Sequence, residues 1–328
     1  MSTCPPLALI VFNRPDVTER VFEAVRAAEP RQLFVLADGP RADRPEEAER
    51  CAETRAIFDR VDWECDVHRR LADENLGCGA SVAEGLDWVF EHVDRVVVLE
   101  DDCLPDPSFF PFCADLLERF ADDERIMHVS GSNLGSPPAA CGGASYGFTT
   151  YPTIWGWATW RRAWGLYDRE MKTWPRFRDA GLVETIPANR RWRATLARDW
   201  EICYRKGPLW RHQWAYQWQY SIVSESGLCV SPAVNLVANV GFGAAGAHTT
   251  LHEHEMGDVP VGAVERPLRH PEFVAVTPAV QAHIQRVELR RTGPVVGAFR
   301  RLVPSRRARL LIKKAMFFRE RSAVHPQT

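Results

Sequence analysis

The feature that most constrains the fold is an apolar run that ends in three carboxylates, Arg95-Val96-Val97-Val98-Leu99-Glu100-Asp101-Asp102. A β-branched run without a polar face is typical of a central strand that is buried on both sides of a parallel sheet. An unpaired carboxylate is costly to bury, so we expect the acids to follow the strand rather than lie within it. There they either cap the strand in solvent or face the crevice in which open α/β sheets bind ligands.

Strands and helices are predicted to alternate along the first half of the chain. Apolar runs at 7–12 and 33–37 predict strands before the one at 95–99, with helical segments between them, and the more polar segment 66–70 is the candidate for a third strand. This order is typical of a doubly wound, mostly parallel α/β sheet with helices on both faces. Because parallel strands end at one edge of a sheet, we expect the polar residues that follow them to converge on one crevice. Those residues are Asn13 and Arg14, then Asp38, then Asp101 and Asp102.

The second half of the chain is rich in aromatic residues. Ten of the twelve tryptophans lie between Trp155 and Trp218. We expect most of them to pack in the core, because aromatic side chains bury large areas, and one or two to offer a flat face to a sugar ring. The Gly/Ala/Pro-rich segment 135–147 predicts a loop between the two halves, and 267–278 predicts a linker to the C-terminal segment.

Charge is balanced over the whole chain but not along it. The 41 basic and 43 acidic residues give a net charge of −2, which provides no argument for nucleic acid as a partner. From Arg286 to the end there are 12 basic and 2 acidic residues, which predicts a basic tail on an acidic body. Residues 306–321 form an imperfect amphipathic pattern that favours binding to an anionic membrane surface. A helix packed on the acidic body, or a disordered end, is the alternative.

The cysteines indicate a reducing compartment. They are nine in number, scattered, and without CxxC spacing, unlike a disulfide or zinc framework. No signal-peptide pattern precedes the first predicted strand, and no apolar run approaches 18 residues. We therefore expect a cytoplasmic protein, and the basic tail favours a peripheral position on the inner face of the cell membrane.

Two sets of short motifs occur in a specific order. The first set is Val11-Phe12-Asn13-Arg14-Pro15, Asp38-Gly39-Pro40-Arg41, Asn75-Leu76-Gly77 and Glu100-Asp101-Asp102. It resembles the nucleotide-sugar half of GT-A-fold glycosyltransferases, in particular a bacterial family-2-like group often labelled hemolysin-type, and animal N-acetylglucosaminyltransferase I. The second set is Trp155-Gly156-Trp157-Ala158-Thr159-Trp160, Tyr216-Gln217-Trp218-Gln219-Tyr220, Asn235-Leu236-Val237 and Gly241-Phe242-Gly243. It resembles the acceptor half of the bacterial group, and the likeness covers roughly residues 7–250.

The resemblance implies a domain organisation and an activity. Residues 1–265 would form a GT-A domain, with a nucleotide-sugar half at 1–132 and an acceptor half at 133–265. Residues 266–328 would be a linker and a basic helical tail. The implied activity is metal-dependent, inverting transfer of a hexosyl or N-acetylhexosaminyl group from a nucleoside-diphosphate sugar. The acceptor would be a hydroxyl of a glycan, of a lipid-linked sugar or of a small molecule.

The resemblance also implies roles for individual residues. Asp38 would contact the nucleobase, Asp102 would bind a Mn²⁺ or Mg²⁺ ion that bridges the diphosphate, and His248 would complete the metal site. A fixed cation suits this chemistry because it stabilises the charge that develops on the diphosphate leaving group. The residues expected around the donor are Phe12, Asn13, Arg14, Asp38, Asn75, Gly77 and Asp101.

The sequence departs from the resemblance at the catalytic base. Inverting members place an acid just after a tryptophan of the aromatic block, but here Trp214 is followed by Ala215. His212 lies on nearly the same face of a predicted helix and is our candidate base, since an imidazole can accept a proton near neutral pH. Asp199 and Glu201 remain alternatives.

Two other functions compete with glycosyl transfer. The missing acid keeps open a non-catalytic relative that binds a nucleotide sugar or glycan. A haloacid-dehalogenase-type phosphotransferase is disfavoured, because its aspartates alternate with other residues near the first strand.

Overall fold

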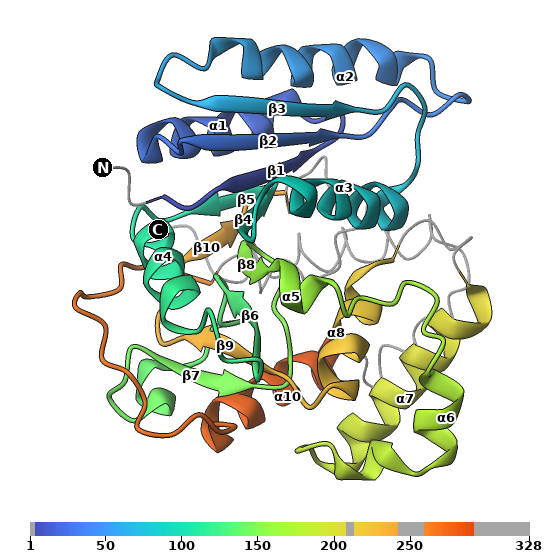
Figure 1. Ribbon diagram of the computed structural model, residues 1–328, viewed down its shortest axis with the longest axis vertical. Coiled ribbons are helices and arrows are strands. Elements are labelled where there is room, and N and C mark those ends of the chain that lie inside the picture. Colours follow the sequence, from blue (N-terminus) through green and yellow to red (C-terminus); the bar gives the residue numbers. More distant parts are fainter. Residues whose placement is uncertain (1–3, 208–212, 242–258, 292–328) are drawn as a thin grey trace, which may run out of the picture.

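The computed structural model describes residues 4–207, 213–241 and 259–291, which are arranged around an eight-stranded sheet with the order β3-β2-β1-β4-β8-β6-β9-β7 (Figure 1). The elements of the first half are β1 (Leu7–Val11), α1 (Pro15–Ala28), β2 (Gln32–Ala37), α2 (Glu46–Ala56), η1 (Ile57–Arg60), β3 (Asp66–Leu71), α3 (Cys78–His92) and β4 (Arg95–Glu100). The next elements are β5 (Cys103–Pro105), α4 (Phe109–Arg119), β6 (Ile126–Ser130), η2 (Pro138–Cys141), β7 (Tyr146–Thr149), β8 (Trp157–Trp160), α5 (Arg161–Trp164) and α6 (Trp174–Asp179). The last are η3 (Leu182–Thr185), α7 (Arg190–Lys206), α8 (Ala215–Ser224), β9 (Leu228–Pro232), β10 (Val237–Asn239) and α10 (Pro278–Arg291).

The sheet is parallel on one side and mixed on the other. Strands β3, β2, β1 and β4 run parallel, and β6 is parallel to β9. Strand β8 is antiparallel to both β4 and β6, and β7 is antiparallel to β9. The predicted mostly parallel α/β sheet is therefore confirmed, and the arrangement is consistent with a GT-A-like fold.

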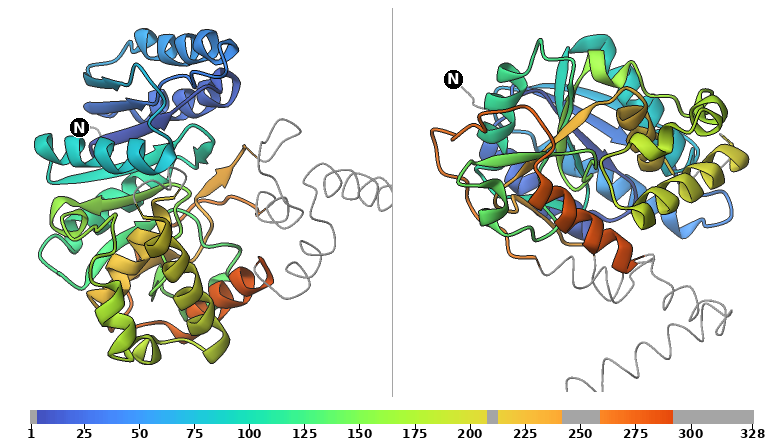
Figure 2. Two further views of the ribbon diagram at one scale, coloured as in Figure 1. Left: turned by 90° about the vertical axis from the view of Figure 1, so that its right-hand side faces the viewer. Right: turned by 90° about the horizontal axis from the view of Figure 1, so that it is seen from below.

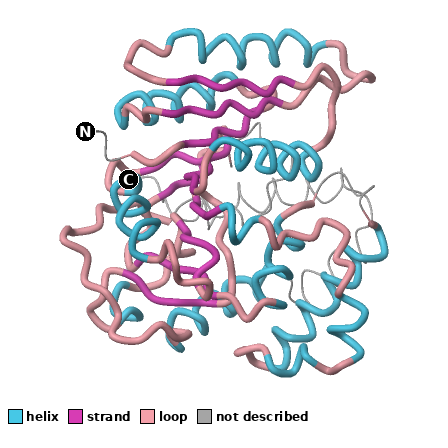
Figure 3. The backbone as a smooth tube through the Cα atoms, viewed as in Figure 1, coloured by secondary structure: helices cyan, strands magenta, loops and turns pink. Residues whose placement is uncertain are grey.

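The central strands alternate their side chains between two cores, one on each face of the sheet. Val97 and Leu99 of β4 pack with α1 and α4, whereas Val96 and Val98 pack with α3, α5 and α8. All four of these side chains are fully buried, as expected for a strand covered on both sides. Helices accordingly lie on both sides of the strand layer (Figure 3).

The sequence-based boundaries need two corrections beyond the parallel part of the sheet. The segment 135–147, expected as a loop, contains η2 and the start of β7, and Ser136 and Cys141 are buried. The segment 266–328, expected as linker and tail, contains α10, whose Val280 and Ile284 are fully buried against η2 and neighbouring residues. Figure 2 shows α10 lying against the body of the molecule. The packed unit therefore includes α10, because these apolar residues need a core.

Most tryptophans of the aromatic block pack in the core, as predicted. Trp157 and Trp218 are buried beside α3 and α5, whereas Trp174 and Trp200 belong to a separate core among α6, α7 and α8. All nine cysteines are free thiols. Within the described residues, no helix combines the length and apolar character needed to span a membrane.

Candidate functional site

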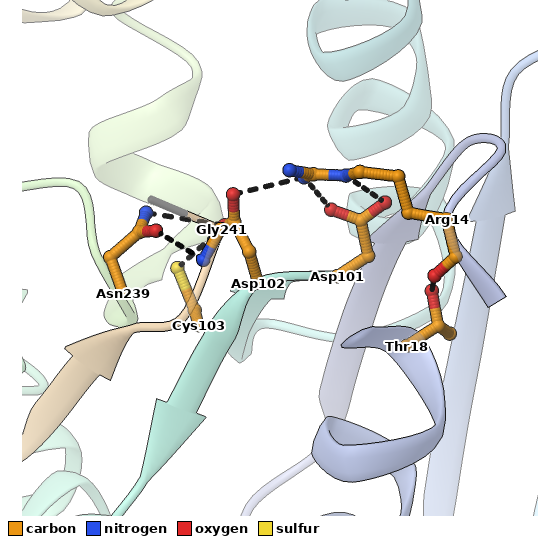
Figure 4. Close-up of polar contacts among 7 residues, drawn as sticks. All are labelled: Arg14, Thr18, Asp101, Asp102, Cys103, Asn239 and Gly241. Carbon is orange, nitrogen blue, oxygen red and sulfur yellow. Dashed lines mark hydrogen bonds and ion pairs between the residues drawn. The ribbon is translucent and has the colours of Figure 1, made fainter. Parts of the chain in front are cut away.

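The site is built around a guanidinium shared by two carboxylates at the edge of the sheet (Figure 4). Arg14 follows β1, and Asp101 and Asp102 follow β4, its parallel neighbour. Arg14 Nε donates to Asp101 Oδ2 at 3.2 Å, and Arg14 Nη2 donates to Asp101 Oδ1. The same Nη2 lies 2.9 Å from Asp102 Oδ2. The predicted convergence of these strand ends is therefore observed.

The backbone of Arg14 is fixed by the start of the next helix. Pro15 occupies the first turn of α1, where its restricted φ suits a helix start and its missing N–H costs nothing. The carbonyl of Arg14 accepts hydrogen bonds from the Thr18 amide at 3.0 Å and from the Thr18 hydroxyl at 2.7 Å. The guanidinium is therefore directed toward the acids by a rigid turn.

Negative charge exceeds positive charge in this cluster. Glu100, Asp101 and Asp102 face one guanidinium, and the Asp101 side chain is only 5% exposed. Burial raises the pKa of Glu100 to about 8, and the Asp102 and Asp101 carboxylates contribute to that shift. Burial also raises the pKa of Asp101, although the Arg14 guanidinium opposes this effect. A further cation at this edge of the sheet would relieve the repulsion.

Asp102 is held from a second side by the end of β10. The side-chain amide of Asn239 donates to Asp102 Oδ1 at 3.3 Å, and the backbone amide of Val240 donates to the Asp102 carbonyl at 2.8 Å. Gly241 follows, and a Cβ atom there would lie 2.3 Å from Asp102 Oδ2 and 2.9 Å from Arg14 Nη1. Glycine is therefore needed for the chain to pass this close to the cluster. Asn239 was not among the predicted site residues; only its nearness to the Gly241 motif could have drawn attention to it.

Asp38 performs a structural task that the sequence did not indicate. Its Oδ1 accepts hydrogen bonds from the amides of Gly39 and Leu76 at 2.9 and 2.8 Å. Its Oδ2 accepts from Asn75 Nδ2 and the Gly77 amide, both at 3.0 Å. The buried carboxylate thus fastens the start of α3 to the end of β2. Contact between Asp38 and a nucleobase stays a prediction.

Phe12 and Asn13 extend the same edge of the sheet. Both are half-buried, and the Arg41 guanidinium lies 5.6 Å from the centre of the Phe12 ring. The Asn13 carbonyl accepts a hydrogen bond from Arg50 Nε at 2.9 Å. Together with Asp38 and the 75–77 segment, they surround the ends of β1 and β2, and their contact with a donor stays a prediction.

The predicted catalytic and metal-binding histidines lie outside the described residues. This applies to both His212 and His248. Of the alternative bases, Glu201 accepts hydrogen bonds from Trp174 Nε1, Arg205 and Arg178, which lower its pKa to about 2. A carboxylate this acidic is a weak base. Asp199 forms an ion pair with Arg198 on α7.

The residues around Asp102 fit a divalent ion that substrate helps to hold. Among the described residues, no group of three His, Cys, Asp or Glu side chains forms a ready metal cage. Mg²⁺ in nucleotide sites commonly uses one or two carboxylates together with waters and substrate phosphates. Asp102 offers such a carboxylate, because its side chain remains 13% exposed at the strand end.

Comparisons with known proteins give only distant structural likenesses. No protein-family model matches the sequence, and no curated protein matches it. HddC from Yersinia pseudotuberculosis, also solved with GMP-PN, aligns with a TM-score of 0.26 and 11% identity over 38% of this chain and 57% of that chain. The galactosyltransferase LgtC, solved with donor and acceptor sugar analogs, aligns with a TM-score of 0.32 and 13% identity over 66% and 70%, respectively. The chain thus spans little more than half the length of HddC.

Proposed function

We propose that this protein is a metal-dependent glycosyltransferase that moves a sugar from a nucleoside-diphosphate sugar to a hydroxyl acceptor with inversion. The observation that carries the proposal is the position of Asp102, partly exposed between Arg14 and Asn239 at the shared end of β1, β4 and β10. Ligands of open α/β sheets bind at this edge. The surplus of carboxylates there favours binding of a divalent cation, and the diphosphate of a donor would supply the remaining ligands of that cation.

Each part of the edge has a role in this proposal. Asp102 would hold Mn²⁺ or Mg²⁺, with His248 as a second protein ligand. The bound ion would neutralise the charge that develops on the leaving diphosphate. Arg14 keeps the Asp101 and Asp102 carboxylates in place, and Phe12, Asn13 and the segment fastened by Asp38 surround the nucleoside. His212 is the proposed base that accepts the proton of the acceptor hydroxyl.

Donor binding tests the proposal directly. A panel of nucleoside diphosphates and their sugars is titrated into the full chain by calorimetry, with and without Mn²⁺. We expect at least one to bind in a Mn²⁺-dependent manner, and Asp102→Ala to abolish that binding without unfolding the protein. Glu118→Ala, an exposed change on α4, is the control. Metal-independent binding, or unchanged affinity in Asp102→Ala, would refute the metal assignment.

Ala215 favours a second candidate function, a non-catalytic protein that binds the same ligands. Turnover separates the two. Radiolabelled donor that binds tightly but is never consumed with any acceptor would support the binding protein. Transfer that falls by at least ~10²-fold in His212→Ala would support the proposed base.

We also propose that the basic segment 306–321 binds anionic membranes, an inference from the sequence because the segment lies outside the described residues. Vesicles containing phosphatidylglycerol should sediment the full chain but not a chain that ends after Arg291, and salt should weaken the effect. Equal recovery of both chains in the supernatant would exclude membrane binding.

A further inference from the structure

An open cavity of about 190 Å³ lies beside the acid cluster and was not predicted from the sequence. Its walls come from the segment before β8, the first turns of α8, and α10. Its size is below that of typical drug-sized pockets, so it suits a small polar ring. The lining residues are Leu134, Tyr151, Pro152, Thr153, Ile154, Trp155, Gln213, Ala215, Tyr216, Gln219 and Glu288.

Aromatic rings form part of the cavity wall and remain accessible. Among the described tryptophans between 155 and 218, Trp155 alone is half-buried, whereas the others are buried. Tyr151 and Tyr216 are half-buried as well. Flat, partly exposed rings can pack against the C–H face of a pyranose, which is apolar. Trp155 is thus the described tryptophan of the aromatic block best placed to meet a sugar.

Polar side chains of the wall are deeply buried. Thr153, Gln219 and Glu288 are 4%, 3% and 3% exposed, respectively. Glu288 is the only carboxylate among the lining residues that the structure describes. A few fixed polar groups in a largely apolar wall are typical of sites that orient a small ligand, and carboxylates and amides pair well with hydroxyls.

The helix that carries Glu288, α10, is fastened to the body although it belongs to a segment that the sequence assigned to the linker and tail. Gln281 and Gln285, earlier on α10, both donate to the Pro187 carbonyl, at 3.0 and 3.2 Å. Gln281 Oε1 also accepts from the Thr150 amide at 3.0 Å. α10 is therefore fastened to the chain just before Tyr151, so that Glu288 and the aromatic wall keep their relative positions.

The cavity lies at the same edge of the sheet as the acid cluster. Val98 of β4 pairs with Trp157, the first residue of the antiparallel β8, so Gly156 and Trp155 precede β8 near the end of β4 at which Glu100 lies. Gly156 packs so closely on Leu99 and Val237 that an added Cβ would lie 3.2 and 2.7 Å from them. The cavity and the cluster of Arg14, Asp101 and Asp102 nevertheless share no lining residue. A ligand in the cavity would therefore lie next to the proposed donor, not within its site.

We propose that this cavity binds one pyranose ring of the acceptor. Trp155 and Tyr216 would contact the ring face, while Glu288 and Gln219 would hydrogen-bond its hydroxyls. The assignment to the acceptor rests on the proposed glycosyl transfer; the recognition of a sugar ring rests on the cavity alone.

The test uses methyl glycosides of glucose, galactose, N-acetylglucosamine and N-acetylgalactosamine as probes. Saturation-transfer NMR and calorimetry measure their binding to the full chain, with and without nucleoside diphosphate and Mn²⁺. We expect at least one probe to bind, and Trp155→Ala and Glu288→Gln each to weaken it by about tenfold or more. Tyr204→Ala and Glu225→Gln, at exposed positions outside the cavity, are matched controls.

Distinct outcomes separate this inference from the proposed function. Nucleotide binding should persist in Trp155→Ala and Glu288→Gln; its loss would assign the cavity to the donor and overturn the acceptor assignment. No probe bound under either condition, or equal binding by variants and wild type, would overturn the sugar site. Failure of nucleotide binding in the wild type refutes the proposed function and, with it, the acceptor assignment, whereas glycoside binding would still support the sugar site.

Discussion

Arg14 Nη2 lies 2.9 Å from Asp102 Oδ2 while the same guanidinium donates to both oxygens of Asp101. One cation thus serves two carboxylates from a neighbouring strand, with Glu100 adjacent. The pair with Asp101 is the more buried of the two, and Asp102 is the more exposed carboxylate. This arrangement separates a structural acid from one that is available to a ligand.

Replacing Arg14 should destabilise the fold, most strongly near neutral pH. Arg14→Met leaves the buried Asp101 carboxylate without its partner, and we expect a loss of about 1–3 kcal/mol in the free energy of unfolding at pH 7. The loss should shrink toward pH 4, because an unpaired buried carboxyl is protonated more readily in the folded state. Urea denaturation at pH 7 and at pH 4 measures the two losses in the free energy of unfolding. Arg26→Met, which breaks an exposed pair with Asp62, should cost far less.

A methyl group at position 241 should disturb ligand binding more than stability. Gly241→Ala would place a Cβ atom 2.3 Å from Asp102 Oδ2, so either the carboxylate or the turn must move. We expect Mn²⁺-dependent nucleotide binding to weaken by tenfold or more, with a small change in melting temperature. Gly165→Ala, where the nearest atom is 3.3 Å away, is the control. Wild-type affinity in Gly241→Ala would argue against Asp102 as the metal ligand.

Removing the hydrogen bonds that the Asp38 carboxylate accepts should loosen the start of α3. Asp38→Asn replaces an acceptor by an amide that would face N–H donors, and we expect a loss of about 1–3 kcal/mol. Hydrogen exchange should show reduced protection at the amides of Leu76 and Gly77, which donate to Asp38. Protection equal to that of the wild type would show that the start of α3 does not depend on the Asp38 carboxylate.

His128 should contribute a loss of stability in acid, because it is buried in its neutral form. Its Nε2 donates to the Thr153 carbonyl and its Nδ1 accepts from Trp218 Nε1, at 3.1 and 3.2 Å. Burial lowers the pKa of His128 to about 3, whereas the unfolded chain titrates near ~6.5. Between these values the unfolded state binds more protons, so the free energy of unfolding decreases as pH falls.

The contribution of His128 approaches about 1.4 kcal/mol per pH unit within that window. Denaturant unfolding between pH 7 and 4 should show it as a stability difference between the wild type and His128→Asn that changes with pH, because the raised pKa values of Glu100 and Asp101 act in both proteins alike. Equal slopes in the wild type and in His128→Asn would contradict the assignment.

Patterns local in sequence determined the α/β class, the strands β1 to β4 and the acids that follow β4. A buried β-branched run and the polar residues just after it are chain neighbours, and parallel pairing brings successive strand ends to one edge. The sequence therefore predicted that Arg14 and Asp102 lie at the same edge of the sheet, and the structure shows their contact. The resemblance assigned Asp38 to the nucleobase, which stays a prediction. The hydrogen bonds that Asp38 accepts from residues 75–77 could not be predicted, because those donors lie far from it in the sequence.

Only the tertiary structure decided which residues form the cavity and that α10 belongs to the packed unit. Glu288 and Trp155 are far apart in the sequence, and no spacing rule relates a C-terminal helix to the segment before β8. They meet because Val280 and Ile284 of α10 need apolar partners and find them beside η2. The burial of one helix face thus brings a carboxylate on that helix to an aromatic wall. Such long-range packing is not encoded in any local pattern.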